Sequence, residues 1–245
     1  MTRFPFLILA AATMAGEALA ACRIEAAGGA DYVVCEFSAR TDRIEFFLRD
    51  ETGAPYGEFS ALKDALAAKG EALVFAMNAG MYREDRSPVG LYVENGATLR
   101  RASMRDGPGN FHLKPNGVFS IGKGEARVSE TGAFLAAGDA PDFATQSGPM
   151  LVIDGAVHPK FLPDSDSRKR RNGVGVTADG EKIFFVLSDS PVTFHAFATF
   201  FRDALKTPNA LYLDGTISRV FAPELSRNDP GLPMGPIVAV VEAHD

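Results

Sequence analysis

Residues 209–219 read NALYLDGTISR. The apolar run Ala210 to Leu213 predicts a short buried strand, and Asp214 follows it on a turn opened by Gly215. A carboxylate at the exit of a buried strand is costly unless another group pairs with it or uses it. Ser218 places a hydroxyl four residues further on. We therefore take Asp214 as the leading candidate for a functional carboxylate.

The same arrangement recurs elsewhere in the chain. Residues 90–96, 150–155 and 175–180 read GLYVENG, MLVIDG and GVTADG. An Asn-Gly or Asp-Gly dipeptide between apolar runs is a strong local signal for a β-hairpin. Tyr32 to Phe37 and Ile44 to Leu48 are further apolar runs, which we interpret as an opening strand pair.

Two helices are expected among these strands. Ser60 would cap a helix from Ala61 to Lys69, and Thr193 would cap a second helix that ends before Pro208. One face of the second helix carries apolar side chains, namely Phe194, Phe197, Phe201 and Leu205. The pattern predicts an α+β (mixed α/β) fold over residues 21–245, a single domain with one large mixed, mostly antiparallel sheet and few helices.

The bulk composition excludes several classes of protein. The chain has 245 residues, of which 46% are hydrophobic and 23% charged, so a disordered chain is excluded. The formal net charge of −6 argues against a general nucleic-acid binder. No stretch after residue 20 is long and apolar enough to predict a transmembrane segment.

Residues 1–20 have the features of a signal peptide. Arg3 precedes the apolar stretch Phe4 to Met14, and residues 18–20, which read ALA, fit a cleavage site for small side chains. The mature chain would then begin at Ala21. We expect a periplasmic or secreted protein.

Two cysteines, Cys22 and Cys35, lie close to this new amino terminus. In an oxidising compartment a disulfide between them is expected. Residues 19–22 also read LAAC, which fits a lipoprotein processing site with Cys22 acylated. Acylation would leave Cys35 without a partner, so the disulfide is the favoured alternative.

A polar side chain also follows the strand predicted from Leu73 to Met77. Residues 75–82 read FAMNAGMY, so Asn78 stands at the strand end, before a turn through Gly80. Its amide offers both a donor and an acceptor, which suits sugar hydroxyls. An asparagine before a glycine is also a common turn residue, and that alternative stays open.

Two further segments bring polar groups to strand entries. Residues 114–119 read KPNGVF, and residues 146–152 read QSGPMLV. Lys114 either meets a phosphate or is a solvated surface lysine. Asn116, Gln146 and Ser147 are candidates for hydrogen bonding to a substrate. Ser147 has no partner base in the sequence, so we do not interpret it as a nucleophile.

A basic cluster comes before the next strand. Residues 168–175 read RKRRNGVG. An arginine matches the geometry of a phosphodiester through two parallel hydrogen bonds, so this cluster could meet such a group. For Arg168, Lys169 and Arg170 a solvated run is the preferred interpretation.

The sequence contains no recognisable metal or nucleotide motif. The four histidines have no ligand spacing, and no Walker loop, zinc cysteine pair or Gly-x-Ser-x-Gly elbow occurs. We therefore assign no metal ligand and no required cofactor, although a divalent ion bridging Asp214 and a phosphate cannot be judged from spacing. His158 is kept as a candidate proton donor. Residues 107–117 are either a loop over a cleft or a solvated connection.

Four of these segments, at residues 75–82, 146–152, 168–175 and 209–219, resemble the phosphodiester glycosidase family in type and order. Two positions depart from the family pattern, because Ala79 and Thr216 stand where the family has glycine. The resemblance implies hydrolysis of the glycosidic bond in a sugar-1-phosphodiester. The implied partner is therefore a substrate, either a small molecule or a polysaccharide that contains this linkage. It implies Asp214 as nucleophile or base and Arg171 as a phosphate clamp.

The resemblance also implies which residues position the sugar and the diester. These are Asn78, Gly80, Lys114, Asn116, Gln146, Ser147, Gly215 and Ser218. Two rival functions remain open at this point. One is a non-catalytic protein that binds cell-surface polysaccharide on the same fold. The other is a phosphoesterase, which usually needs a metal cluster that the sequence does not display.

Overall fold

The structure is a computed structural model that describes residues 21–215 and 217–243. The expected signal peptide, residues 1–20, lies outside the described residues, as does Thr216. The largest of three sheets has seven strands in the order β1-β2-β13-β12-β14-β10-β11. Its strands are β1 (Cys22–Ala27), β2 (Ala30–Ser38), β10 (Met150–Ile153), β11 (Ala156–Val157), β12 (Asn172–Val176), β13 (Lys182–Ser188) and β14 (Asn209–Asp214).

Two five-stranded sheets complete the fold, in the orders β16-β15-β4-β17-β3 and β6-β5-β9-β7-β8. The first comprises β3 (Ile44–Phe47), β4 (Glu71–Asn78), β15 (Val220–Ala222), β16 (Arg227–Asn228) and β17 (Ile237–Ala243). The second comprises β5 (Tyr92–Glu94), β6 (Ala97–Arg100), β7 (Gly117–Gly122), β8 (Glu125–Glu130) and β9 (Phe143–Ser147). The α+β class with mostly antiparallel strands is confirmed. The strands divide among three sheets rather than forming one, because open sheets of more than about ten strands are rare.

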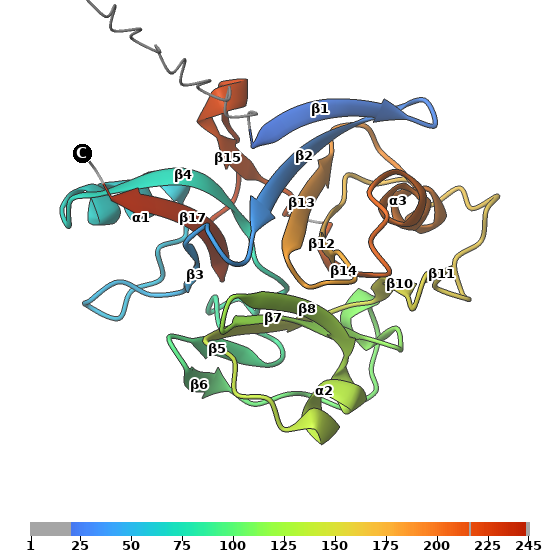
Figure 1. Ribbon diagram of the computed structural model, residues 1–245, viewed down its shortest axis with the longest axis horizontal. Coiled ribbons are helices and arrows are strands. Elements are labelled where there is room, and N and C mark those ends of the chain that lie inside the picture. Colours follow the sequence, from blue (N-terminus) through green and yellow to red (C-terminus); the bar gives the residue numbers. More distant parts are fainter. Residues whose placement is uncertain (1–20, 216, 244–245) are drawn as a thin grey trace, which may run out of the picture.

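Each sheet has one helix on its outer face (Figure 1). These helices are α1 (Phe59–Ala67), α2 (Thr131–Ala137) and α3 (Phe194–Thr199), with α3 continuing as a π-helical turn over Phe200–Ala204. Short 3₁₀ turns occur at Asn110–His112 and Pro223–Leu225. The inner faces of all three sheets meet in one apolar core, to which Phe185, Phe75 and Phe119 contribute from β13, β4 and β7.

Successive side chains along the strands of the seven-stranded sheet alternate between its two faces. One face packs on the common core and the other packs against α3. On β14, Leu211 and Leu213 face the common core, whereas Ala210 and Tyr212 pack with the cluster that includes Phe197 of α3. This is the period of two expected for a strand that is buried on both faces. Strand β14 therefore ends between two apolar layers, and Asp214 is its last residue.

The hairpins predicted from Asn-Gly and Asp-Gly are confirmed. Strands β5 and β6 pair around Asn95-Gly96, and β10 and β11 pair around Asp154-Gly155. Strands β12 and β13 form the third hairpin, with Val176 opposite Ile183. The predicted opening strand pair is wrong: β2 pairs with β1 and β13, while β3 pairs with β17 in another sheet. Both edges of β2 are already occupied, so the next strand in sequence joins a different sheet.

The two predicted helix caps differ in outcome. The Thr193 hydroxyl accepts a hydrogen bond from the Ala196 N–H at 3.0 Å, so this cap is confirmed. The predicted Ser60 cap is wrong, because α1 begins at Phe59 with Glu58 as its N-cap residue. The Glu58 side chain makes no capping hydrogen bond and instead accepts from Arg219 at 2.6 Å.

Cys22 and Cys35 form the expected disulfide, which joins directly opposed residues of β1 and β2. In this form the Cys22 sulfur is bonded to Cys35, which leaves no thiol for acylation. Among the helices of the described residues, none is both long enough and apolar enough to cross a membrane.

Candidate functional site

Asp214 is held in place at the end of β14 by the side chain of Asn172. The backbone N–H of Asp214 donates to Asn172 Oδ1 at 2.8 Å. The Asp214 carboxylate in turn accepts from the Gly215 N–H at 2.6 Å, and the Ser218 hydroxyl reaches the Asp214 carbonyl at 3.4 Å. The turn after β14 is thus fixed by local hydrogen bonds, which orients the carboxylate.

Asn172 also connects Asp214 to Asn78. Its Nδ2 group donates to Asn78 Oδ1, which further accepts from the Arg219 backbone N–H at 3.3 Å. Asn78 is the last residue of β4, so this contact joins the five-stranded sheet to the seven-stranded one. The structure therefore links Asn78 to the Asp214 backbone through one intervening side chain, that of Asn172.

The amide nitrogen of Asn78 has an unusual environment. Asn78 is fully buried, and its Nδ2 group has no hydrogen-bond partner among the residues that the structure describes. A buried donor without a partner costs about 1–3 kcal/mol, so proteins seldom keep one without a use for it. The same Asn78 side chain is bonded through its Oδ1 atom to Asn172, which in turn binds the Asp214 backbone N–H.

Arg171 is the largest fully buried side chain described, with an exposed fraction of 1%. Its Nε donates to the Val192 carbonyl at 2.9 Å and its Nη2 to the Ser167 carbonyl at 3.1 Å. The guanidinium carbon lies 3.6 Å from the centre of the Phe194 ring. No carboxylate of the described residues forms an ion pair with Arg171. Its other neighbour is the Tyr212 hydroxyl, so only neutral groups surround this guanidinium in the described part of the chain. A buried cation held by neutral groups alone is costly unless a further group compensates its charge.

Tyr212 lies between Arg171 and the Asp214 turn. The Arg171 guanidinium is 5.7 Å from the centre of its ring, and a Cβ added to Gly215 would lie 1.9 Å from the Tyr212 hydroxyl. Only glycine fits at position 215 for this reason. Burial raises the pKa of Tyr212 to about 12, with the Arg171 charge opposing and the Asp214 carboxylate adding to the shift. The hydroxyl is therefore protonated at neutral pH.

Burial of Arg171 lowers the pKa of its guanidinium, and the neighbouring Tyr212 hydroxyl opposes that shift.

A second tyrosine, Tyr82, interacts electrostatically with the Asp214 carboxylate. Burial raises the pKa of Tyr82, and the Asp214 carboxylate raises it further. The Tyr82 hydroxyl donates to the Pro233 carbonyl at 3.1 Å. Tyr82 is partly exposed and therefore suits stacking on a sugar, whereas the Tyr212 ring is buried in an apolar cluster.

The turn after Asn78 packs closely against β9. A Cβ on Gly80, whose φ is 134°, would lie 2.9 Å from the Thr145 hydroxyl, which itself donates to the Ala79 carbonyl at 2.7 Å. The Ser147 hydroxyl donates to the Leu213 carbonyl at 2.9 Å. Ser147 and Gly80 therefore support the two strand ends that carry Asp214 and Asn78.

Gln146 and Asn116 are engaged within the protein. Gln146 Oε1 accepts from the N–H groups of Leu91 and Ser103, and its Nε2 donates to the Ser103 carbonyl and the Thr131 hydroxyl. These four contacts fill the capacity of the amide. Asn116 bonds to the Thr131 hydroxyl and the Phe111 carbonyl. Both side chains are buried beneath the 101–113 segment.

Lys114 and His158 meet at one turn. The Lys114 ammonium donates to the Met104 carbonyl at 2.7 Å. His158 Nδ1 accepts from the Lys160 N–H at 3.2 Å, so Nε2 carries the ring proton and donates to the Lys114 carbonyl at 3.2 Å. Burial lowers the pKa of His158, which therefore stays neutral. Its ring stacks on Phe161, which stacks on Phe194 beneath Arg171.

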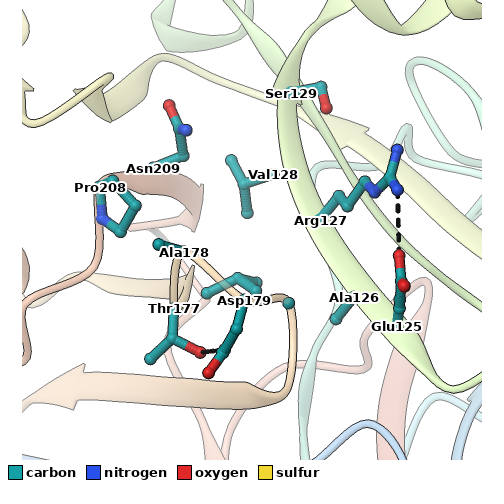
Figure 2. A pocket seen from close by; sticks show the side chains of 12 residues that line it. Glu125, Ala126, Arg127, Val128, Ser129, Thr177, Ala178, Asp179, Pro208 and Asn209 are labelled. Atoms are coloured by element: carbon teal, nitrogen blue, oxygen red, sulfur yellow. Dashed lines mark hydrogen bonds and ion pairs between the residues drawn. The ribbon is translucent and has the colours of Figure 1, made fainter.

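A hollow of about 460 Å³ opens at the opposite end of β14, beside Asn209 (Figure 2). The charged side chains in its lining each interact with a neighbouring polar or charged group. Arg127 pairs with Glu125 at 3.0 Å, and the Asp179 carboxylate accepts from the Thr177 hydroxyl at 2.6 Å. In the described residues, no cluster of three or more His, Cys, Asp or Glu side chains could hold a metal ion.

The sequence analysis singled out neither Asn172, which links the two sheets, nor the Tyr212 hydroxyl, which lies close to Gly215 and Arg171. The signal for Asn172 is its position directly after Arg171 at a strand start. Neighbouring residues of a strand point to opposite faces, so one reaches the helix side and the other the seam with β4. Tyr212 precedes Asp214 by two residues on the same strand.

Comparison with known proteins gives consistent results. A family model described as phosphodiester glycosidase matches residues 71–240. The uncharacterized protein YigE of Escherichia coli (strain K12) is 35% identical over 182 residues, covering 74% of this chain and 70% of that protein. Two solved structures share the fold. The zebrafish N-acetylglucosamine-1-phosphodiester alpha-N-acetylglucosaminidase catalytic domain, auto-inhibited by its pro-peptide, aligns with a TM-score of 0.61 at 12% identity, over 89% of this chain and 81% of that one. A hypothetical protein from Synechocystis aligns at 0.54 and 14% identity, over 90% and 61%.

Proposed function

The chain belongs to the phosphodiester glycosidase family, and on that premise we propose that it hydrolyses the glycosidic bond of a sugar-1-phosphodiester at Asp214 and Arg171. The observation that carries the proposal is the chain of hydrogen bonds from Asn78 through Asn172 to Asp214. It joins a candidate carboxylate to a buried amide donor that has no partner among the described residues. Arg171, next to Asn172 in sequence, adds a buried cation.

In this mechanism the anomeric carbon lies next to the Asp214 carboxylate. The carboxylate acts as nucleophile or as base toward water, and it stabilises the positive charge that develops on the sugar. The bond from the anomeric carbon to the phosphate oxygen breaks, and the electron pair leaves with the phosphate. Water supplies the hydroxyl of the free sugar, and its proton compensates the charge of the new phosphomonoester.

Arg171 and Tyr212 would stabilise the departing phosphate. Two of the guanidinium hydrogen bonds go to backbone carbonyls and one joins the Tyr212 hydroxyl, and the N–H groups that are left would donate to the diester. The Tyr212 hydroxyl, protonated at neutral pH, is a second donor in the same place. A phosphodiester is already a good leaving group, so strong general-acid assistance is less necessary than for an ordinary glycoside.

Of the other candidate residues, some would contact the substrate and others would hold the surrounding turns and loops in place. Asn78 Nδ2 would donate to a sugar hydroxyl, with the partly exposed Tyr82 beside the ring. Gln146 and Asn116 would act by holding the 101–113 segment, because their amides are engaged with backbone and Thr131. Ser147, Gly80 and Ser218 would fix the turns that carry Asp214 and Asn78.

The protein would act outside the cytoplasm. The disulfide between Cys22 and Cys35 supports this, because disulfides persist in oxidising compartments. The signal peptide expected at residues 1–20 agrees with the same location.

Hydrolysis of a synthetic glycosyl phosphodiester in water labelled with heavy oxygen tests the reaction class. Cleavage at carbon places the label on the sugar, which is the expected result. Label on the phosphate would instead identify a phosphoesterase. Binding without any turnover would favour the non-catalytic polysaccharide-binding protein.

A further inference from the structure

A second cavity of the protein is strongly basic. It has a volume of about 890 Å³ and is lined by residues from the turn after β4, from β6 and from the 101–113 segment. Its cationic lining residues are Arg83, Arg100, Arg101 and Arg105, with His112 at one side. We call this cavity the basic pocket. Asp106 is the one carboxylate in the lining, and it lies 3.7 Å from the Lys114 ammonium, outside the lining set.

The arginines of the basic pocket are not neutralised within the described part of the chain. None of the four forms an ion pair with a carboxylate there, whereas arginines elsewhere, such as Arg227 and Arg23, do. Arg83 donates to the Pro88 carbonyl at 3.1 Å, a neutral acceptor. The whole protein carries a formal charge of −6. Four unpaired cations around one cavity of an acidic protein create a local positive field that attracts anions.

The basic pocket is connected to the candidate site through the 101–113 segment. Gln146 holds Ser103 by two hydrogen bonds of 2.8 Å, and Lys114 binds the Met104 carbonyl. At the other end of the segment, a side-chain hydrogen bond from Asn110 influences the pKa of Tyr212. The residue after Gln146, Ser147, donates to the Leu213 carbonyl next to Asp214. One segment therefore lines the basic pocket and also reaches the Tyr212 hydroxyl.

We propose that the basic pocket binds further negative charges of an extended substrate, so that the substrate class is a glycan chain carrying several phosphodiesters. The inference rests on the proposed function, because it takes one phosphodiester to lie between Asp214 and Arg171. The neighbouring phosphates then lie in the field of Arg100, Arg101 and Arg105. The cavity volume is that of a binding cleft for a ligand of several sugar units.

The test compares two substrates with two variants. One substrate is a glycosyl phosphodiester with a single phosphate, and the other is an oligomer with four phosphodiesters linking the same sugar. The variant Arg100→Ala/Arg105→Ala removes two cations whose side chains make no described hydrogen bond. The control, Arg40→Ala/Lys63→Ala, removes two exposed cations that do not line the pocket and gives the same change in net charge.

We expect kcat/KM on the oligomer to fall by about tenfold in the pocket variant, mostly through KM, because exposed arginine–phosphate contacts act mainly on binding. The single-phosphate substrate and the control variant should change by less than about twofold. The loss on the oligomer should shrink at high salt, since the contacts are screened. An equal loss on both substrates, or no loss on the oligomer, overturns the proposal.

A binding measurement separates this proposal from the proposed function. Fluorescence titration of the four-phosphate oligomer uses Asp214→Asn, with and without the two pocket substitutions. Tighter binding with the intact pocket supports the inference even if the protein hydrolyses neither substrate. Single-stranded DNA with the same number of phosphates is the competitor. If it binds as tightly as the glycan, the assignment to a glycan is overturned.

Discussion

The two ends of strand β14 differ in how completely their polar groups are paired. At the Asn209 end, in the hollow of Figure 2, Arg127 pairs with Glu125, and the Asp179 carboxylate accepts a hydrogen bond from the Thr177 hydroxyl in the same turn. At the Asp214 end, the Asn78 amide nitrogen has no partner among the described residues and Arg171 is buried without a carboxylate. A large hollow marks the first end and incomplete pairing marks the second. We conclude that unsatisfied buried polar groups identify this site better than cavity size does.

The largest effect should come from the charge of Asp214. Asp214→Asn keeps the backbone bond to Asn172 and an acceptor for the Gly215 N–H, but it removes the negative charge. We expect the rate of phosphodiester hydrolysis to fall about 10³-fold or more, with the melting temperature little changed. Initial rates and a melting curve measure the two quantities. Asp154→Asn, in the Asp-Gly turn near Asn209, is the control and should keep full activity. Full turnover by folded Asp214→Asn would make Asp214 a turn residue only.

Arg171 offers the next largest effect and a contrast between activity and stability. Arg171→Met keeps an unbranched side chain against Phe194 while removing a buried charge that has no carboxylate partner in the described chain. Activity should fall about 100-fold through weaker binding and slower turnover. Stability should be unchanged or higher by about 1 kcal/mol, because the burial cost of the charge disappears. Urea unfolding with parallel kinetics tests this, and a strong loss of stability with normal kinetics would contradict it.

The contact between Gly215 and Tyr212 gives a smaller effect that can be reversed. Gly215→Ala would bring a methyl group to 1.9 Å from the Tyr212 hydroxyl, so the turn or the ring must move. We expect a loss of about 2 kcal/mol of stability together with reduced activity. Tyr212→Phe removes the hydroxyl and should recover more than half of that loss. A double-mutant cycle measures the coupling, and additive effects would show that the two groups do not touch.

The smallest effect belongs to the Asn209 end. Arg127→Ala removes a side chain that is 59% exposed and paired with Glu125. The stability change should stay within about 0.5 kcal/mol, and hydrolysis should be unaffected. If Arg127→Ala abolished hydrolysis, the difference between the two ends of β14 would disappear.

The parts of the fold that depend on neighbouring residues could be predicted from the sequence. Hairpins at Asn95-Gly96 and Asp154-Gly155 follow from turn chemistry, and the Thr193 cap follows from a single hydroxyl. Division into three sheets could not be predicted. It depends on which distant strands pair, as when β17 lies between β4 and β3. The Ser60 cap is wrong because Glu58, which pairs with Arg219, is the N-cap residue, two positions before Ser60.

The candidate site divides in the same way. Asp214 could be found because a charge at the exit of an apolar strand is visible in the sequence. The link from Asn172 to Asn78 joins residues 94 positions apart and depends on a shift of register between Asn172 and Gly173. Neither the long sequence separation of Asn78 and Asn172 nor the irregular pairing at Asn172 produces a local pattern in the sequence. The same holds for the Tyr212 hydroxyl, whose neighbours Gly215, Arg171 and Asn110 come together only in the folded chain.

Strand β17 couples the candidate site to a strand made much later in synthesis. It is the last strand that the structure describes, and it pairs with β4 on one side and β3 on the other. A ribosome-bound chain that has not yet reached Ile237 therefore lacks the central ladder of this sheet and leaves both partners unpaired. Asn78 belongs to β4, so the amide that we propose as a donor to the sugar reaches its final position only after β17 docks. The candidate site is therefore expected to form late, after pairing between strands that are far apart in the sequence.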